Sequence, residues 1–333
     1  MSPAGPGAAT RRRGSVPVSA LGPMTRLNSG ANGTIHRLDD FQLVDEPGEL
    51  VFKEYNLSVV RASLGGLEKL VDVRRSLAAQ RRAVLDEMTV WPLCAVAGPA
   101  DEPLGVLMKL IPGGYFEQMA LPSGRRDQVP REVQHLIFEA AVARRREVDV
   151  PADGDPHTRL RICERFSYIL SILHGANLVY GDVSARNVLY QLRPRPGVLL
   201  VDCDAARVHG SAAVNKQQHS PDWDPPERAG GQSFTTDRYK LALFVLRCLV
   251  PGKGSSLNRD WRSASAVLDT QGLRLLKLGL GADPARRPLA REWVFYLRSR
   301  LGIAAMPVVP AAVPIRQPRE TGWRRGPHGW IPA

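Results

Sequence analysis

Three oxygen-bearing side chains stand out because their types and spacing suit the chemistry of phosphate. Asp182 is followed five residues later by Asn187, and Asp202 comes directly after the apolar stretch 198–201. Carboxylate and amide oxygens from different loops can hold Mg²⁺ between them, and a further carboxylate can accept the proton of an arriving hydroxyl. A lone Asp at a strand end is usually only a turn or cap residue. Several such residues in order along the chain favour a phosphoryl-transfer site instead.

The elements that must position these residues change in type along the chain. Strand patterns prevail over residues 24–112, and helical patterns prevail from Gly113 onward. We expect strands at residues 50–55, 91–96, 105–111, 188–191 and 198–201, and helices at residues 64–87, 131–147, 158–176, 237–249, 272–280 and 290–301. The prediction is an α+β, bilobal domain over residues 23–302, with a small lobe at 23–112, a larger helical lobe at 113–302 and a ligand cleft between them.

Two features of the first lobe suit a bound phosphate. Gly30 and Gly33 lie between expected strands, where glycine lets backbone N–H groups approach phosphate oxygens. The sequence Asn32-Gly33 is equally typical of an ordinary hairpin turn. Lys53 lies in the middle of the apolar strand 50–55. Its ammonium either reaches solvent from an edge strand or grips the phosphates of a nucleotide.

In their order along residues 24–302, these motifs resemble those of the protein kinase superfamily. The resemblance rests on segments that look like the glycine-rich loop, the lysine strand, the hinge, the catalytic loop, the D-F-G and A-P-E motifs, the start of the large-lobe helix and the late arginine motif. These segments are 28–35, 51–53, 107–114, 182–187, 202–204, 225–227, 237–242 and 283–288. The resemblance implies an ATP- and Mg²⁺-dependent kinase acting on Ser or Thr of a protein. A nucleotide-binding or scaffolding pseudokinase and a small-molecule kinase remain alternatives.

The resemblance also assigns roles to individual residues. Asp182 would accept or orient the proton of the attacking hydroxyl, while Asn187 and Asp202 would hold Mg²⁺. Lys53 would contact the phosphates of ATP, and Glu227 would form a structural ion pair with Arg287. The remaining nucleotide contacts are expected from the glycine-rich loop and the hinge, through Gly30, Gly33, Ile35, Met108, Lys109, Leu110 and Ile111.

Several positions depart from the usual pattern. Gly181 stands where an Arg normally precedes the catalytic Asp, and Ser184 replaces a Lys that commonly contacts the γ-phosphate. Cys203 and Asp204 replace the Phe and Gly of D-F-G, and we expect Cys203 to be a small buried residue rather than a redox sensor. Either Glu68 or Asp72 could pair with Lys53, and Glu68 is preferred. Such departures resemble those of divergent bacterial kinase-like proteins.

Composition limits the remaining possibilities. The formal net charge is +12, but seven of these charges come from residues 1–26 and 303–333. Charge concentrated in tails argues against nucleic acid as the primary ligand and favours solvated arms that touch an acidic partner. We expect disorder over residues 1–22 and in the Pro-rich tail 303–333, although its two tryptophans leave docking open. Four scattered cysteines and the lack of an apolar span or secretory signal predict a cytoplasmic protein without a membrane partner.

Overall fold

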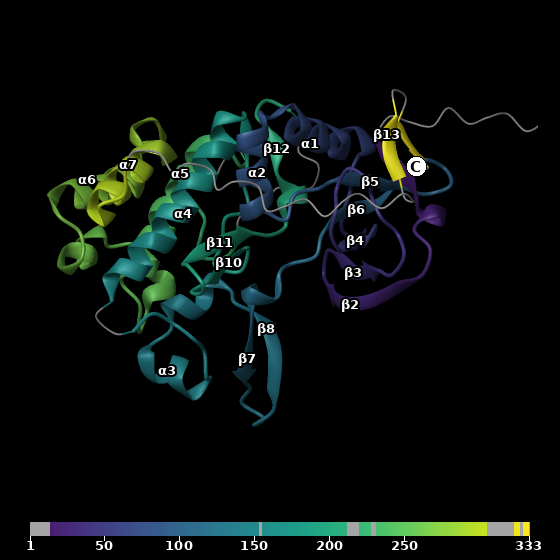
Figure 1. Ribbon diagram of the computed structural model, residues 1–333. Coiled ribbons are helices and arrows are strands. Elements are labelled where there is room, and N and C mark those ends of the chain that lie inside the picture. The colour runs from purple at the N-terminus through teal and green to yellow at the C-terminus, as the bar shows by residue number, and fades with distance from the viewer. Residues whose placement is uncertain are drawn as a thin grey trace, which may run out of the picture. The chain divides into compact units, whose positions relative to one another are not determined.

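The chain forms a mixed α+β protein in two compact units (Figure 1). The computed structural model describes residues 14–152, 155–211, 220–227, 231–304, 323–326 and 329–332. Unit 1 comprises Met1–Asp72, Pro92–Leu110 and Ala312–Ala333, and unit 2 comprises Val73–Trp91 and Ile111–Ala311. Among the described residues, no helix is both long and apolar enough to span a bilayer.

Unit 1 contains a six-stranded sheet and most of one helix. The elements are β1 (Ser15–Pro17), the 3₁₀ helix η1 (Val18–Ala20), β2 (Met24–Gly30), β3 (Gly33–Leu38), β4 (Leu50–Tyr55), α1 (Leu64–Ser76), β5 (Cys94–Ala97) and β6 (Pro103–Lys109). The strand order is β1-β5-β6-β4-β3-β2, and every neighbouring pair is antiparallel except β1 and β5. β4 is therefore an interior strand, so Lys53 is not on an edge.

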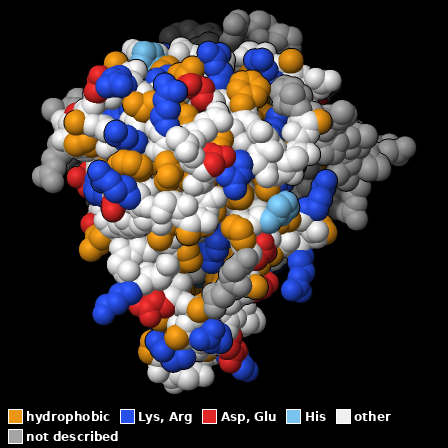
Figure 2. All heavy atoms as spheres, turned by 90° about the vertical axis from the view of Figure 1, so that its left-hand side faces the viewer, with side chains coloured by type: hydrophobic (Ala, Val, Ile, Leu, Met, Phe, Trp, Pro, Cys, Tyr) orange, Lys and Arg blue, Asp and Glu red, His pale blue; other side chains and the backbone are white. Residues whose placement is uncertain are grey.

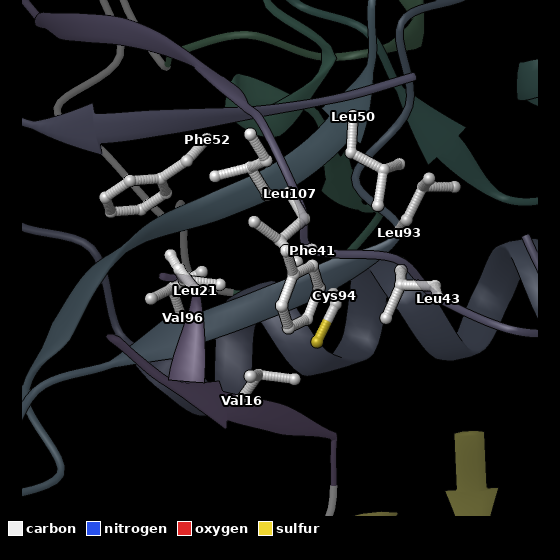
Figure 3. Packing of buried hydrophobic residues seen from close by; sticks show 11 residues of the cluster. Val16, Leu21, Phe41, Leu43, Leu50, Phe52, Leu93, Cys94, Val96 and Leu107 are labelled. Atoms are coloured by element: carbon white, nitrogen blue, oxygen red, sulfur yellow. The ribbon is translucent and has the colours of Figure 1, made fainter. Parts of the chain in front are cut away.

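One face of this sheet is covered by a hydrophobic core. Alternate residues of β4 and β5, such as Leu50, Phe52 and Cys94, point into it, as the pleat of a strand requires. Segments outside the central strands add Phe41 and Leu43 (Figure 3). Because side chains alternate along β4, the residues between these core positions face the opposite side of the sheet.

Unit 2 is mainly helical. Its α-helices are α2 (Ala79–Met88), α3 (Ala140–Arg145), α4 (Pro156–Gly175), α5 (Phe234–Leu249), α6 (Thr270–Gly279) and α7 (Ala290–Leu301). Its strands are β7 (Phe116–Ala120), β8 (Arg126–Pro130), β9 (Leu178–Val179), β10 (Val188–Gln191), β11 (Gly197–Leu200) and β12 (Arg207–Val208). Its 3₁₀ helices are η2 (Gly113–Tyr115), η3 (Val133–Ile137), η4 (Cys203–Ala205), η5 (Ser255–Leu257), η6 (Trp261–Ala266) and η7 (Pro284–Arg286).

The two longest helices form the centre of unit 2. α4 packs against both α5 and α7, and Phe166 of α4 stacks on Phe244 of α5 with ring centroids 4.1 Å apart. α5 starts at a capping box between Ser233 and Thr236 and is buried along nearly its whole length. A helix that is buried on all sides is a rigid support. α5 carries the residues that hold the candidate site.

The sequence-based prediction of secondary structure is correct in several places and wrong in others. β4, β10 and α7 have the predicted bounds. The helix predicted over 64–87 is two helices, because Ala78 is extended between α1 and α2. The helix predicted over 131–147 is also broken, since Phe138 and Glu139 are extended between η3 and α3. The β7–β8 hairpin was not predicted.

Parts of the predicted disordered tails are ordered. β1 and η1 lie within residues 1–22. Val16 of β1 is fully buried in the core, and β1 pairs with β5. β13 (Trp323–Gly326) and β14 (Gly329–Pro332) pair as an antiparallel hairpin, held by backbone hydrogen bonds, within the predicted Pro-rich tail. Residues 1–13 and 305–322 lie outside the described part of the chain.

Candidate functional site

The predicted loop that carries Asp182 and Asn187 is a short irregular segment between β9 and β10. Its first residue, Tyr180, is buried, and the phenol donates hydrogen bonds to the carbonyl oxygens of Asn187 at 2.9 Å and Val201 at 2.7 Å. Burial raises the pKa of Tyr180 well above its ordinary value, so the hydroxyl remains a donor. Tyr180 therefore ties the two ends of the loop to the strand that leads to Asp202.

The structure brings Asp182 and Asn187 into direct contact. The Nδ2 of Asn187 donates to Oδ2 of Asp182 at 2.7 Å and to its carbonyl oxygen at 2.9 Å. The other carboxylate oxygen of Asp182, Oδ1, accepts a hydrogen bond from Oγ of Ser220 at 3.0 Å. The carboxylate of Asp182 is thus oriented by two neutral donors. With its amide nitrogen facing Asp182, Asn187 directs its amide oxygen away from that residue.

Helix α5 holds the backbone of the loop through two of its residues. The carboxylate of Asp237 accepts hydrogen bonds from the N–H groups of Tyr180 and Gly181, each at 2.9 Å. The ammonium of Lys240 donates to the carbonyl oxygen of Gly181 at 2.7 Å. Both side chains are fully buried. The peptide groups on both sides of Gly181 are therefore fixed by one turn of helix.

The same two residues set the electrostatics behind the loop. Burial lowers the pKa of Lys240 from its ordinary value, while the carboxylates of Asp237, Asp182 and Asp224 act in the opposite direction. His174 adds a contact of 3.1 Å to the carboxylate of Asp237. Lys240 therefore places a buried ammonium behind the loop, bonded to the carbonyl oxygen of Gly181.

Gly181 is required by the backbone at this point. Its φ is +80°, in the left-handed region that side chains disfavour, and a Cβ there would overlap the amide oxygen of Gln232. Gly181 stands where the kinase resemblance leads one to expect an Arg. The carbonyl that this residue presents is instead bonded to Lys240 of α5.

Asp202 lies beside this loop in the same unit. The N–H of Val201 donates to the carbonyl oxygen of Asn187 at 3.0 Å, which places Asp202 one residue from a direct backbone contact with the loop. Asp202 adopts φ +53°, a left-handed conformation that is uncommon for any residue with a side chain. Cys203 is fully buried and its thiol contacts the carbonyl oxygen of Leu200, in agreement with a small packing residue.

The side chains of Asn187 and Asp202 are both of a type that binds Mg²⁺. Both supply oxygen, which Mg²⁺ prefers, and Mg²⁺ commonly binds through one or two protein groups with phosphates and water completing its shell. In the described part of the chain, no group of three or more His, Cys, Asp or Glu residues is arranged to hold a metal by itself.

Lys53 and Met108 lie in unit 1, on the sheet face opposite the hydrophobic core. Lys53 is only 6 % exposed and pairs across the sheet with Ile35 of β3 and Val106 of β6. Met108 pairs with Val51 on the same face. Lys53 therefore shares this face of the sheet with Ile35, Val106 and Met108.

The predicted glycine-rich segment is a tight hairpin between β2 and β3. Gly30 and Gly33 pair directly, and the carbonyl oxygen of Asn32 accepts a hydrogen bond from Asn56. A Cβ on Gly33 would overlap the carbonyl oxygen of Glu54 in β4, whereas a Cβ on Gly30 would meet nothing within 4 Å. Gly33 is therefore needed for strand packing, and only Gly30 borders open space.

The predicted hinge begins at the end of β6. Met108 is buried, and the N–H of Leu110 donates to the carbonyl oxygen of Glu49 at 3.0 Å, so Leu110 can offer a ligand only its carbonyl. Ile111 is the first residue of the second segment of unit 2.

Glu68, the preferred candidate partner of Lys53, lies against Gly14. A Cβ added to Gly14 would come within 3.0 Å of Cγ of Glu68. The pairing of Lys53 with Glu68 or Asp72 stays a prediction.

The predicted ion pair between Glu227 and Arg287 is confirmed. The guanidinium of Arg287 donates from Nη1 to Oε1 at 2.7 Å and from Nη2 to Oε2 at 2.6 Å. Arg287 is buried and lies over the ring of Tyr239, 5.0 Å from its centroid. These two parallel hydrogen bonds join the segment 225–227 to Arg287, which lies between η7 and α7.

Sequence reasoning missed three contacts of this site. These are the hydrogen bond from Ser220 to Asp182, the two bonds accepted by Asp237, and the bond donated by Lys240. A signal existed, because Asp237 and Lys240 are three residues apart, directly before an apolar run of the helix, and so share one face of it. Searches with the sequence found no matching protein-family model and no matching curated protein.

Proposed function

We propose that this protein is an ATP- and Mg²⁺-dependent phosphotransferase that transfers the γ-phosphoryl group to a Ser or Thr hydroxyl of a protein. The observation that supports this best is the way Asp182 is prepared. Its carboxylate is oriented by Asn187 and Ser220, and the backbone next to it is fixed by Asp237 and Lys240. Such preorganisation is what phosphoryl transfer asks of a protein.

The roles of the chain's own residues follow from this arrangement. Asp182 orients the attacking hydroxyl and accepts its proton. The amide oxygen of Asn187 and the carboxylate of Asp202 would hold Mg²⁺, which when bound neutralises charge on the phosphate oxygens. Lys53 contacts the phosphates, and the apolar side chains around it, including Ile35 and Met108, contact the base.

The proposal includes a bilobal, kinase-like fold and a cytoplasmic location. It also includes an acidic partner for the basic tails. The ion pair of Glu227 and Arg287 supports the protein-kinase branch rather than a small-molecule kinase. It joins the two segments that resemble the A-P-E and late arginine motifs.

A second candidate is a pseudokinase that binds nucleotide without turnover. Two observations favour it. Both carboxylate oxygens of Asp182 already accept hydrogen bonds within the protein. The hydroxyl of Ser184, at the position of the usual phosphate-contacting Lys, faces the backbone N–H groups of Arg186 and Asn187.

The test is transfer of a γ-phosphate label from ATP with Mg²⁺, using the full chain and a generic protein substrate. We expect label on protein that Asp182→Asn reduces by several orders of magnitude, whereas the control Asp127→Asn, an exposed Asp of the β7–β8 hairpin, retains it. Thermal stabilisation by Mg²⁺ and ATP without label transfer would favour the pseudokinase. Absence of both effects would refute both candidates.

A further inference from the structure

A cavity of about 360 Å³ lies within unit 2, away from the loop that carries Asp182. Helices α5, α6 and α7 and the 3₁₀ helix η7 form its walls. The lining residues are Arg238, Gln271, Arg274, Leu275, Leu278, Ala285, Arg286, Arg287, Pro288, Leu289 and Glu292. This volume is in the range of small-molecule sites. We call it the arginine pocket.

The charge of the arginine pocket is strongly one-sided. Four arginines line it, from three different elements, against a single acid, Glu292. The charge of Arg287 is balanced by Glu227 through two hydrogen bonds, and the carboxylate of Glu292 accepts from the N–H of Leu289 at 2.6 Å. Two positive charges therefore remain after each acid is matched with one arginine.

Arg238 is the arginine least exposed to solvent after Arg287. Burial lowers its pKa, and neighbouring Arg291 adds to that effect, while Glu292 and Asp237 oppose it. Its Nε is buried and has no hydrogen-bond partner among the described residues, and the Nε of Arg287 is in the same state. Buried donors without a partner are costly in a folded protein. Both arginines therefore keep a donor that the described residues leave unused.

The rest of the pocket adds two features. The side chains of Leu275, Leu278, Pro288 and Leu289 supply apolar wall next to the arginines. The first turn of the twelve-residue helix α7 also borders the pocket, and the positive end of a helix dipole adds to the attraction for an anion. Figure 2 looks onto the side of the molecule where α6 and α7 lie, and Lys and Arg side chains are spread across that surface.

We propose that the arginine pocket binds a small molecule that carries a phosphoryl group, with Arg238 and Arg274 contacting the phosphate oxygens and the leucines contacting the remainder. A planar guanidinium matches phosphate with two parallel hydrogen bonds. Arg274 and Arg286 are exposed and can reach the ligand from α6 and η7, while Arg238 forms the deeper contact from α5. This site does not depend on the proposed kinase activity.

The experiment is calorimetric titration of the full chain with pyrophosphate in magnesium-free buffer. The variants are Arg238→Gln, Arg274→Gln, Lys53→Met and, as a matched control, Arg125→Gln, which removes an exposed arginine of the β7–β8 hairpin. We expect binding by the unaltered protein, weakened about ten- to a hundredfold by Arg238→Gln and by Arg274→Gln, and unchanged in Arg125→Gln. Lys53→Met, which removes the ammonium proposed to contact the phosphates of ATP, measures the share of pyrophosphate binding that belongs to unit 1. Arg274→Gln changes an exposed side chain, so its thermal unfolding temperature should stay the same.

Three results would overturn the proposal: no pyrophosphate binding at millimolar concentration, equal binding by all variants, or loss only in Lys53→Met. The last result would assign the phosphate to unit 1. A phosphoserine peptide is the further arm. If it binds through Arg238 and Arg274 while pyrophosphate does not, the pocket is a docking site for a modified protein and the small-molecule assignment is wrong.

Discussion

The ammonium nitrogen of Lys240 lies 2.7 Å from the carbonyl oxygen of Gly181, and the N–H of Gly181 donates to Asp237 one helical turn earlier on α5. Both polar groups of one glycine are therefore bonded to the same helix. These two bonds fix the backbone directly before Asp182. Gly181 and Ser184 are both uncharged, and Lys240 supplies a buried cation behind the loop.

Lys240→Met should destabilise the protein and weaken catalysis together. The substitution keeps the volume of the side chain but leaves the carbonyl of Gly181 without this donor, which should cost about 1.5–3 kcal/mol of unfolding free energy. Urea denaturation measures the loss, and label transfer from ATP should fall by more than the folded fraction does. Lys253→Met, at an exposed lysine, is the control. A variant with full activity would show that Lys240 does not position the loop.

The two glycines of the β2–β3 hairpin should respond differently to alanine. Gly33→Ala should lower the unfolding temperature, because its Cβ would overlap the backbone of Glu54. Gly30→Ala meets no atom within 4 Å and should leave that temperature unchanged. If the hairpin covers the phosphates of a bound nucleotide, Gly30→Ala should weaken Mg²⁺-ATP binding in a fluorescence titration without changing the unfolding temperature. Unaltered nucleotide affinity in Gly30→Ala would argue that this segment is an ordinary turn.

The ion pair of Glu227 and Arg287 should contribute to folding and not to the chemical step. Arg287→Met leaves the carboxylate of Glu227 without its fork of hydrogen bonds, and should cost about 3 kcal/mol, the lower end for buried pairs, since Glu227 is 23 % exposed. The double variant with Glu227→Leu should recover part of this cost. A double-mutant cycle measured by denaturation gives the coupling, and values near zero would contradict the structural role.

Stability at alkaline pH should fall partly because of Tyr115. Burial raises the pKa of this phenol from 10.0 to about 12, so the folded protein keeps it neutral while the unfolded chain ionises. A raised pKa contributes stability in full below about pH 10, and that contribution is lost as the pH rises toward about 12. Tyr115→Phe should make the unfolding free energy, measured by denaturation at each pH, less steep over this window. The same slope in both proteins would assign it to other groups.

A contact between residues far apart in the chain could be predicted from the sequence where two recognisable motifs carried those residues. Glu227 and Arg287 are far apart in the chain, yet their pairing was foreseen from two short segments. β4 and α7 were predicted with correct bounds because a central strand and an amphipathic helix carry clear periodicity. Such features depend on local pattern or on a recognisable pair of motifs.

What was not predicted depends on tertiary contacts. Nothing local marks Phe138 and Glu139 as extended within an apparently helical stretch. Val16 looks like part of a low-complexity tail until its burial against β5 is known. The role of Lys240 was also hidden, because its partner is a carbonyl oxygen, and any residue can supply one.

Because α5 is buried in the centre of unit 2, the loop bonded to it should share the slow hydrogen exchange of that core. Amide protons in irregular segments usually exchange through small local openings. The amides of Tyr180 and Gly181 donate to a carboxylate that is itself inside the core, so they should exchange only when unit 2 unfolds as a whole. The amide of Ser123, an exposed residue in the β7–β8 turn, measured in the same mass-spectrometric experiment, should exchange much faster. In kinetic terms, this irregular segment belongs to the most slowly opening part of the fold.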